Sequence, residues 1–400
     1  MNLRSIDIRH ADIKLALQSS SVSLRNLIKI IKKLIKIILI SFISEKSYPL
    51  LLKINMSSSS YNESLIELLH SISTSCDRYV AICIFLFGVV GNMLNICVLS
   101  QRTFCSNSCA WAFLVSSIAN LISIVSGLFT RIINGWAIDP ASYIGWICKI
   151  RAHVVFTTRT IALWLIVIAT IDRWLLSSID ANRRRKCTLK NAQRWTTVTI
   201  IFSILLYAQM FYCYEANLAN TSLKCNGKTD ACLYLTNLSF AFITILIPLF
   251  LMSVFGLLTI SNVRQSQRRL QSLTLWHTTS AAIRSSVTNG EHSQGKLKRK
   301  ADHSLLRMLL VQVLLMAILT LPLSIQNFYS FFSRENKSAI YEAIDYFSYN
   351  TTDLIYFVSN GIPFYIYTLC GGLVFRKALY DSFELLKQKI MCHSACVLQK

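Results

Sequence analysis

Charged residues are scarce in this chain of 400 residues. Asp, Glu, Lys and Arg make up 15% of it, whereas hydrophobic residues make up 53%. Soluble domains carry about 25% charge, so this chain has too few polar groups to cover a water-exposed surface. The sequence also holds only 5 prolines and 12 glycines, which disfavours an all-β or disordered protein. These shortages point to a helical membrane protein with several spans.

Acidic residues are scarcer still. The chain has 19 Asp and Glu against 41 Lys and Arg, a net charge of +22. The basic residues gather between the long apolar segments, at 29–36, 183–186, 264–269, 296–300 and 376–389. A nucleic-acid-binding protein would carry such runs on a soluble domain. The positive-inside rule explains their positions more simply, and we expect no nucleic-acid partner.

The sequence shows no residue pattern that would indicate a metal site or a catalytic site. The seven histidines, at positions 10, 70, 153, 277, 292, 303 and 393, are scattered and form no metal-ligand spacing. We expect no metal, no cofactor and no enzymatic activity. A transporter or channel is the rival class, and it would show internal repeats or Gly/Pro-broken half-helices. We find neither, and keep that class as the alternative.

Seven segments are long and apolar enough to cross a membrane as helices, because a span needs about 20 apolar residues. They are Tyr79–Ser100, Trp111–Ile133, Gly145–Leu176, Trp195–Cys213, Tyr234–Ile260, Leu305–Tyr329 and Thr352–Val374. The third and seventh contain polar residues and should score weakest by hydropathy. The expected fold is an all-α membrane protein, a seven-transmembrane helix bundle with a short amphipathic helix after the seventh span.

Two signals orient the bundle. The basic runs follow spans 1, 3, 5 and 7, which places those sides in the cytoplasm. Six Asn-x-Ser/Thr glycosylation triplets all fall on the opposite side, at Asn55, Asn62, Asn220, Asn237, Asn336 and Asn350. We therefore expect a plasma-membrane protein whose N-terminus is extracellular.

Three regions follow from this topology. Residues 1–78 would be an extracellular N-terminal region, 79–374 the seven-span domain, and 375–400 a cytoplasmic amphipathic helix and tail. Residues 1–55 differ from the rest, since Leu27–Ile40 reads LIKIIKKLIKIILI. Two interpretations stand: a cationic amphipathic helix lying on a membrane, or a leader upstream of a true start at Met56, outside the mature protein.

The third span ends in Asp172-Arg173-Trp174, and Cys148 lies 25 residues before Arg173 (173 − 148). Further matches in chain order are Gly91-Asn92 in span 1, Pro248 in span 5, Pro322 in span 6, Pro363 with Tyr367 in span 7, and Phe375–Leu379 after it. Together these residues resemble the rhodopsin-like (class A) G-protein-coupled receptors, and among them invertebrate neuropeptide receptors. The resemblance covers about Tyr79 to Ser382 and implies a heterotrimeric G protein as partner.

The sequence departs from the family at several switch positions. Asn120 stands where the family has a buried Asp in span 2, which puts sodium-dependent inhibition in doubt. Leu319-Thr320-Leu321-Pro322 replaces the family's Cys-Trp-x-Pro, so the tryptophan toggle is missing. Pro363 lies one place early relative to Tyr367, and Gly256 replaces a Tyr in span 5. The tyrosine pair of the active state is thus incomplete.

The resemblance also suggests how the third span would act as a switch. A charge at the membrane boundary can reach water or a partner, and Asp172 could hold Arg173 by a charge-assisted hydrogen bond. Asp302 lies twenty residues before Pro322, where the family places an acidic partner in span 6. We hypothesise an inactive-state link between Arg173 and Asp302 that breaks when span 6 moves outward. The alternative is two exposed boundary charges contributing ~0–1 kcal/mol.

Thirteen cysteines are present, and most lie inside the spans. Cys76, Cys148, Cys225 and Cys232 would face the oxidising exterior. The family resemblance favours a Cys148–Cys225 disulfide, with Cys232 as the other candidate partner. Cys392 and Cys396 follow an amphipathic stretch, which makes them either palmitoylation sites or free thiols of the tail.

Arg159 is the most informative residue for ligand binding. It lies eleven residues from Cys148, about 16 Å down a helix, and an arginine at that depth is a functional-site hypothesis by default. Asp353 is expected at a similar depth on span 7. Either the two pair with each other, which could be a purely structural pair that closes the bundle, or they separately bind an acid and an amine of a ligand.

Other positions narrow the ligand class. Val155 stands seven residues after Cys148, where biogenic-amine receptors carry an Asp, so that class is disfavoured. The long loop from Glu215 to Thr236, with two cysteines and a glycosylation triplet, is typical of peptide receptors. We expect a neuropeptide, with a small chemosensory molecule as the alternative. Arg131, Arg151 and His153 would suit an acidic or an amidated peptide. The Ser/Thr-rich loop 262–301 suits a receptor kinase and arrestin.

Overall fold

The computed structural model describes residues 58–101, 104, 106–136, 140–217, 225–280, 291–332, 339–370, 375–382 and 384. The contact pattern divides the chain into two units, Met1–Thr74 and Ser75–Lys400. In the first unit the described element is helix α2 (Ser58–Ser75), on which Asn62 is exposed.

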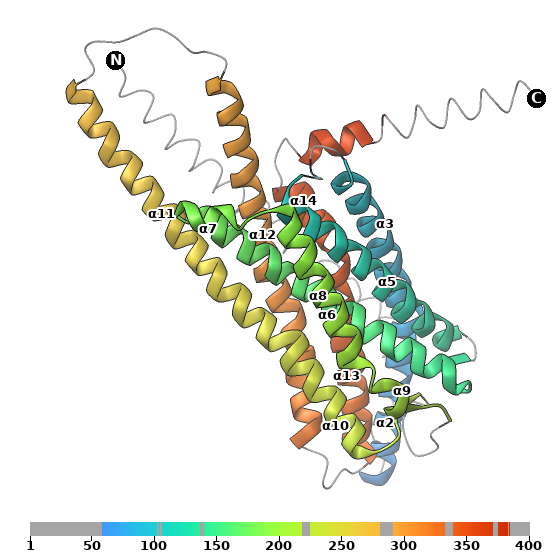
Figure 1. Ribbon diagram of the computed structural model, residues 1–400. Helices are drawn as coiled ribbons and strands as arrows, with labels where there is room; N and C mark the ends of the chain where they lie inside the picture. The colour runs from blue at the N-terminus through green and yellow to red at the C-terminus, as the bar shows by residue number, and fades with distance from the viewer. Residues whose placement is uncertain are drawn as a thin grey trace, which may run out of the picture. The chain divides into compact units, whose positions relative to one another are not determined.

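The second unit is a bundle of long helices (Figure 1). Its elements are η1 (Cys76–Val80), α3 (Ala81–Leu99), α5 (Ser108–Trp136), η2 (Pro140–Ser142), α6 (Gly145–Ser177), α7 (Ala181–Arg185), α8 (Leu189–Tyr207), α9 (Met210–Cys213), β1 (Tyr214–Glu215), β2 (Asn226–Gly227), α10 (Asp230–Ser239), η3 (Phe240–Leu246), α11 (Ile247–Ser280), α12 (Glu291–Phe332), α13 (Ala339–Gly361) and α14 (Pro363–Cys370). The strands β1 and β2 pair as a short antiparallel hairpin. Residues 375–382 are helical, as expected after the seventh span.

Six described helical segments meet the length and hydropathy needed for a membrane span: Asn62–Leu99, Ser108–Trp136, Gly145–Ser177, Leu189–Cys213, Asp230–Ser266 and Leu309–Ser330. Helices α13 and α14 do not meet this test, because the break at Ile362 divides the expected seventh span and its last residues lie outside the described ones. The weak hydropathy expected of that span stays a prediction. The third span does not share that weakness, since the fourth has the lowest hydropathy of the six.

The seventh span begins earlier than the sequence predicted. The expected start was Thr352, but α13 begins at Ala339. The intervening residues include Glu342, Asp345 and several tyrosines, and so lack a hydrophobic run. They are helical because their mixed side chains pack against α12. Gln326 of α12 donates a hydrogen bond to Asp345 at 2.7 Å.

Helix α6 is the centre of the bundle. It packs against α5, α8 and α11, and 72% of its apolar window is buried. Close approach elsewhere depends on glycine. A Cβ on Gly361 of α13 would lie 2.9 Å from Cα of Gly88 in α3, so α13 does not tolerate a larger residue at this position. These contacts bring α3, α5, α6 and α13 around a common interior.

Candidate functional site

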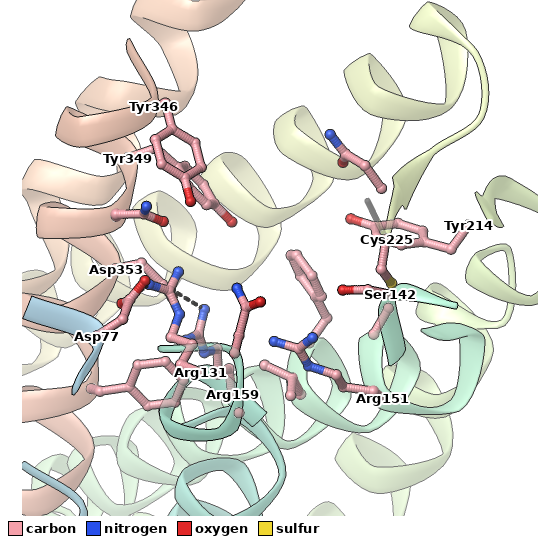
Figure 2. Close-up of a pocket in the computed structure, with 18 of the residues that line it drawn as sticks. Asp77, Arg131, Ser142, Arg151, Arg159, Tyr214, Cys225, Tyr346, Tyr349 and Asp353 are labelled. Carbon is pink, nitrogen blue, oxygen red and sulfur yellow. Dashed lines mark hydrogen bonds and ion pairs between the residues drawn. The ribbon is translucent and has the colours of Figure 1, made fainter. Parts of the chain in front are cut away.

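A cavity of about 330 Å³ opens among η1, α5, α6, α13 and the β1–β2 hairpin. Its charged lining residues are Asp77, Arg131, Arg151, Arg159 and Asp353 (Figure 2). Ligand pockets run from about 300 to 1,000 Å³, so this one suits a small molecule or one end of a larger one. The combination of a concave, partly aromatic wall with converging charges identifies it as the candidate binding site.

A chain of ion pairs crosses the cavity. Arg159 Nη1 lies 2.7 Å from Oδ1 of Asp353, and Arg131 Nη2 lies 2.8 Å from Oδ2 of the same carboxylate. Arg131 also reaches Oδ1 of Asp77 at 3.2 Å. The chain therefore joins η1, α5, α13 and α6 through four side chains. Buried charges need such partners, because an isolated charge in a low-dielectric interior is costly.

Arg159 is the most deeply enclosed of these charges. Its side chain is 3% exposed, and its Cζ lies 4.3 Å from the ring centre of Phe357 and 4.6 Å from that of Tyr356. Phe240 of η3 adds a third ring at 5.8 Å. Aromatic faces stabilise a desolvated guanidinium but leave its N–H edges needing acceptors. Nε and Nη2 of Arg159 have no hydrogen-bond partner among the described residues.

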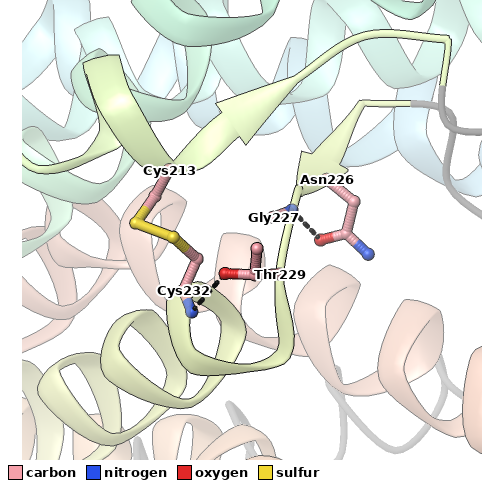
Figure 3. Close-up of a disulfide and its surroundings, with 5 residues drawn as sticks. All are labelled: Cys213, Asn226, Gly227, Thr229 and Cys232. Carbon is pink, nitrogen blue, oxygen red and sulfur yellow. Dashed lines mark hydrogen bonds between the residues drawn. A yellow bond between two sulfur atoms is a disulfide. The ribbon is translucent and has the colours of Figure 1, made fainter.

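Two disulfides fix the hairpin over this cavity. The Cys148–Cys225 bond is present, as expected, and ties α6 to the residue before β2. Cys232 bonds instead to Cys213, at the end of α9 (Figure 3). This second bond was not predicted from the sequence, because Cys213 lies at the end of the predicted fourth span. The bonded hairpin places Tyr214 and Cys225 in the cavity wall.

The predicted ligand residues divide clearly. Arg159, Asp353 and Val155 all line the cavity, and Arg159 pairs with Asp353 in the absence of a ligand. Arg131 and Arg151 also line it. His153 is absent from the wall: its Nδ1 lies 3.0 Å from the carbonyl oxygen of Tyr207, and its ring packs at a tilt against Phe211.

Asp77 was missed by the sequence analysis, and Arg131 was not recognised as an ion-pair residue. Arg131 is an arginine inside a predicted span, which is the same signal that identified Arg159. Asp77 lies only two residues before the predicted first span. That signal was weak, because an acid at a span boundary is ordinarily solvated.

The Asp172-Arg173 pair lies at the opposite end of α6, and its described contacts are with residues 107 and 108 and with the loop after α7. Asp172 accepts hydrogen bonds from Ser108 Oγ at 2.7 Å and from Cys187 Sγ at 2.8 Å. Arg173 donates from Nη2 to Asn107 at 2.9 Å. Within the described part of the chain, no ion pair joins Asp172 to Arg173. The two residues instead bind successive residues at the start of α5, so the expected direct hydrogen bond is wrong.

The Cys187 thiol is shielded on the loop between α7 and α8. Its pKa is raised to about 12, first by burial and then by the neighbouring negative charge of Asp172 and the hydrogen bond to it. The thiol therefore stays protonated at physiological pH and serves as a donor to Asp172.

Span 7 has its own cluster near this end. Tyr367 donates a hydrogen bond of 2.7 Å to Gln312 of α12, and its ring packs near Phe113 and Phe375. Phe375 begins the helix at 375–382 and is 2% exposed. Pro322 lies inside α12, and Pro363 opens α14 after the break at Ile362. Tyr367 therefore joins spans 6 and 7 through Gln312. Its usual tyrosine partner in span 5 is replaced by Gly256.

Several predicted sites lie outside the described residues: the side chain of Asp302, the triplets at Asn55, Asn220 and Asn336, and the tail thiols Cys392 and Cys396. Two further triplets fall within helices. Asn237 is partly buried in α10, and Asn350 is 3% exposed in α13, where it lines the cavity. The burial of Asn350 argues against a glycan there, because its attachment needs an accessible side chain.

Comparison with known families agrees with this geometry. A family model described as 7 transmembrane receptor (rhodopsin family) matches residues 91–367, which is more than half of the chain. The chain belongs to the rhodopsin family of seven-transmembrane receptors. No curated protein sequence matches this chain. Family membership makes it a multi-pass membrane receptor with an extracellular ligand and a G-protein partner, and it excludes the transporter alternative.

Proposed function

We propose that this receptor binds a neuropeptide in the cavity between α5, α6 and α13 and activates a heterotrimeric G protein at the Arg173 end. The buried chain from Asp77 through Arg131 and Asp353 to Arg159 carries the proposal. Four buried charged side chains converge there in a cavity, and such a cluster of charges in a cavity is typical of a binding site.

The orientation follows from chemistry at the two ends. Disulfides persist in oxidising surroundings, so the end with Cys148–Cys225 and Cys213–Cys232 faces outside the plasma membrane. The exposed basic residues of α7, Arg183–Arg185, lie at the other end and face the cytoplasm.

A peptide would enter with one end only. The cavity of about 330 Å³ is at the small limit for ligand pockets, so most of a peptide would rest on the hairpin and the helix ends. The same volume also favours the second candidate, a small chemosensory molecule held entirely inside. Val155 in the wall offers no charge for an amine, which disfavours biogenic amines in either case.

At the cytoplasmic end we propose that Arg173 is the switch. It is 4% exposed and holds Asn107 in the conformation described above. Outward motion of α12 would free it for the G protein, and Asp302 would oppose that motion in the resting receptor. Asp302→Ala should therefore raise basal signalling, and an unchanged basal level would remove Asp302 from the switch. Phosphorylation of residues 262–301 by a receptor kinase, arrestin binding and lipidation at Cys392 and Cys396 complete the proposal.

The test is a calcium and cyclic-AMP screen of cells expressing the receptor against a library of neuropeptides and small metabolites. A hit should be lost in Arg159→Ala and in Arg173→Ala while surface expression stays normal. Arg159→Ala removes ligand binding, whereas Arg173→Ala removes coupling but leaves binding intact. A response that persists in Arg173→Ala would contradict the assigned switch.

A further inference from the structure

The acceptors around Arg159 are too few for its donors. A guanidinium has five N–H donors, and Arg159 uses one nitrogen, Nη1, on a carboxylate that it shares with Arg131. Nε and Nη2 are buried without hydrogen-bond partners among the described residues. Because an unsatisfied buried donor costs about 1–3 kcal/mol, and more when charged, the site is built to gain an acceptor.

The balance of charges in the cavity also favours an anionic ligand. Its lining contains three guanidinium groups, on Arg131, Arg151 and Arg159, and two carboxylates, on Asp77 and Asp353. No other Asp, Glu, Lys, Arg or His is present among the described lining residues. The acidic groups already bind arginines at 2.7 to 3.2 Å. A ligand cation would compete with those arginines, whereas a ligand anion would supply what the site lacks.

We propose that the cavity binds a carboxylate of its ligand by ion-pair exchange. The incoming carboxylate takes the place of Asp353 on Arg159, and Asp353 stays on Arg131. Carboxylates fit a guanidinium edge with two parallel hydrogen bonds, so Nη1 and Nη2 can both be used. The rings of Phe357 and Tyr356 cover the faces of Arg159 and leave this edge for the ligand. The inference rests on the proposed ligand-binding role of the cavity and names the chemical class it takes.

The exchange would also move α13 relative to α6. The Arg159–Asp353 ion pair is the direct charged link between these two helices. Asp353 is buried in α13, nine residues before the break at Ile362 (362 − 353). Transfer of Arg159 to the ligand would remove this link and change how α13 packs on α6. A carboxylate ligand thereby stabilises one of two arrangements, which is what a receptor ligand must do.

The test measures binding of four probes to the purified full-length receptor by thermal shift and calorimetry. N-acetyl-phenylalanine carries an α-carboxylate beside an aromatic ring. N-acetyl-glutamate α-amide carries only a side-chain carboxylate, N-acetyl-phenylalaninamide is neutral, and phenethylamine is a cation. We expect one or both carboxylates to bind at millimolar concentration. The preference between them tells a peptide C-terminus from an acidic side chain.

Two variants should shift carboxylate binding in opposite directions. Arg159→Gln should weaken it at least tenfold, because a charge-assisted hydrogen bond is lost. Asp353→Asn should strengthen it several-fold, because the competing carboxylate is gone. Arg194→Gln, an exposed arginine on α8, is the matched control and should bind as the wild type does. A purely structural ion pair predicts that both Arg159→Gln and Asp353→Asn lose stability with no opposite effect on binding.

The inference is overturned if the amide or the amine binds as well as the carboxylates, if the two variants change affinity in the same direction, or if no carboxylate binds at millimolar concentration. Basal GTP exchange on a G protein is measured in parallel on the wild type and on Arg173→Ala. Exchange that depends on Arg173 but is accompanied by no carboxylate binding would preserve the receptor function and reject this ligand class alone.

Discussion

Asp353 of α13 pairs with Arg131 of α5 at 2.8 Å while its other oxygen holds Arg159 of α6 at 2.7 Å. One carboxylate therefore binds two guanidinium groups on different helices. The Asp353 side chain that carries it is 5% exposed. Asp77, by contrast, forms its ion pair with Arg131, at 3.2 Å, and with no second arginine among the described residues. This asymmetry makes Asp353 the acid on which the packing of three spans depends.

Asp353→Asn should destabilise the receptor more than Asp77→Asn. Removing one partner of a buried ion pair costs about 3–5 kcal/mol, and Asp353 leaves two arginines without their acid. Asp77→Asn leaves Arg131 with Asp353, so its cost should be smaller. Thermal unfolding of the purified receptor without ligand measures both. Asp180→Asn is the control, because its pair with Arg183 is half exposed and worth about 0–1 kcal/mol. Equal losses for Asp353→Asn and Asp77→Asn would contradict the shared-acid interpretation.

Loss of the second disulfide should loosen the hairpin. Cys213 and Cys232 close a loop with a sequence separation of 19, for which the chain-entropy estimate is about 3 kcal/mol. Cys213→Ser, Cys232→Ser and the double variant should therefore lower the unfolding temperature equally, since each breaks the same bond. Thermal unfolding and surface expression are the measurements, with exposed Cys83→Ser as control. A double variant less stable than either single one would mean that the thiols act separately.

The sequence predicted well the features that depend on continuous apolar segments or on helical rise. It placed the start of α6 at Gly145 and its end within one residue of Ser177. Counting fourteen residues outward from Arg173 (173 − 159) and from Tyr367 (367 − 353) also put Arg159 and Asp353 at a similar depth, and they are paired. Both successes rest on distances along a single helix, which a sequence states directly.

The sequence failed where packing between distant segments decides the outcome. The start of α13 carries mixed polar residues whose helical state depends on α12, so it was predicted as loop. The contact of Asp77 with Arg131 spans 54 positions and depends on how η1 meets α5. The partner of Asp172 was taken to be its neighbour Arg173, although Cys187 lies fifteen residues away on a loop that folds back.

Cys187 predicts a pH dependence at the cytoplasmic end. Its pKa is raised from 9.0 to about 12, so the folded state holds the thiol proton more tightly than the unfolded chain does. The resulting stability is fully present below pH 9 and is lost as the pH rises toward 12. Asp172→Asn should lower this pKa only in part, because burial is the largest cause and is unchanged. Alkylation of Cys187, followed by mass spectrometry from pH 7 to 10, should be slow in the wild type and faster in Asp172→Asn.

Ser108→Ala is the control for the alkylation experiment. It removes a neutral hydrogen-bond donor from Asp172, and a contact of 3.5 Å with Cys187 that lowers the pKa of the thiol, but it keeps the negative charge. The pKa of Cys187 should therefore stay high. Equal alkylation rates in the wild type and in Asp172→Asn would show that the carboxylate does not govern the thiol.

Gly127 of α5 tests how tightly the base of the cavity is packed. A Cβ at this position would lie 2.8 Å from Cε1 of Phe357, the ring that covers Arg159, and 3.5 Å from Val155. Gly127→Ala should therefore displace Phe357 and cost about 1–3 kcal/mol, the usual range for overpacking. Adding Phe357→Leu should recover part of this loss, because the smaller side chain makes room for the methyl group. Gly145→Ala is the matched control, since no atom lies within 4 Å of its added Cβ. Thermal unfolding of the four receptors decides the matter, and a Gly127→Ala receptor as stable as Gly145→Ala would show that Phe357 is free to move aside.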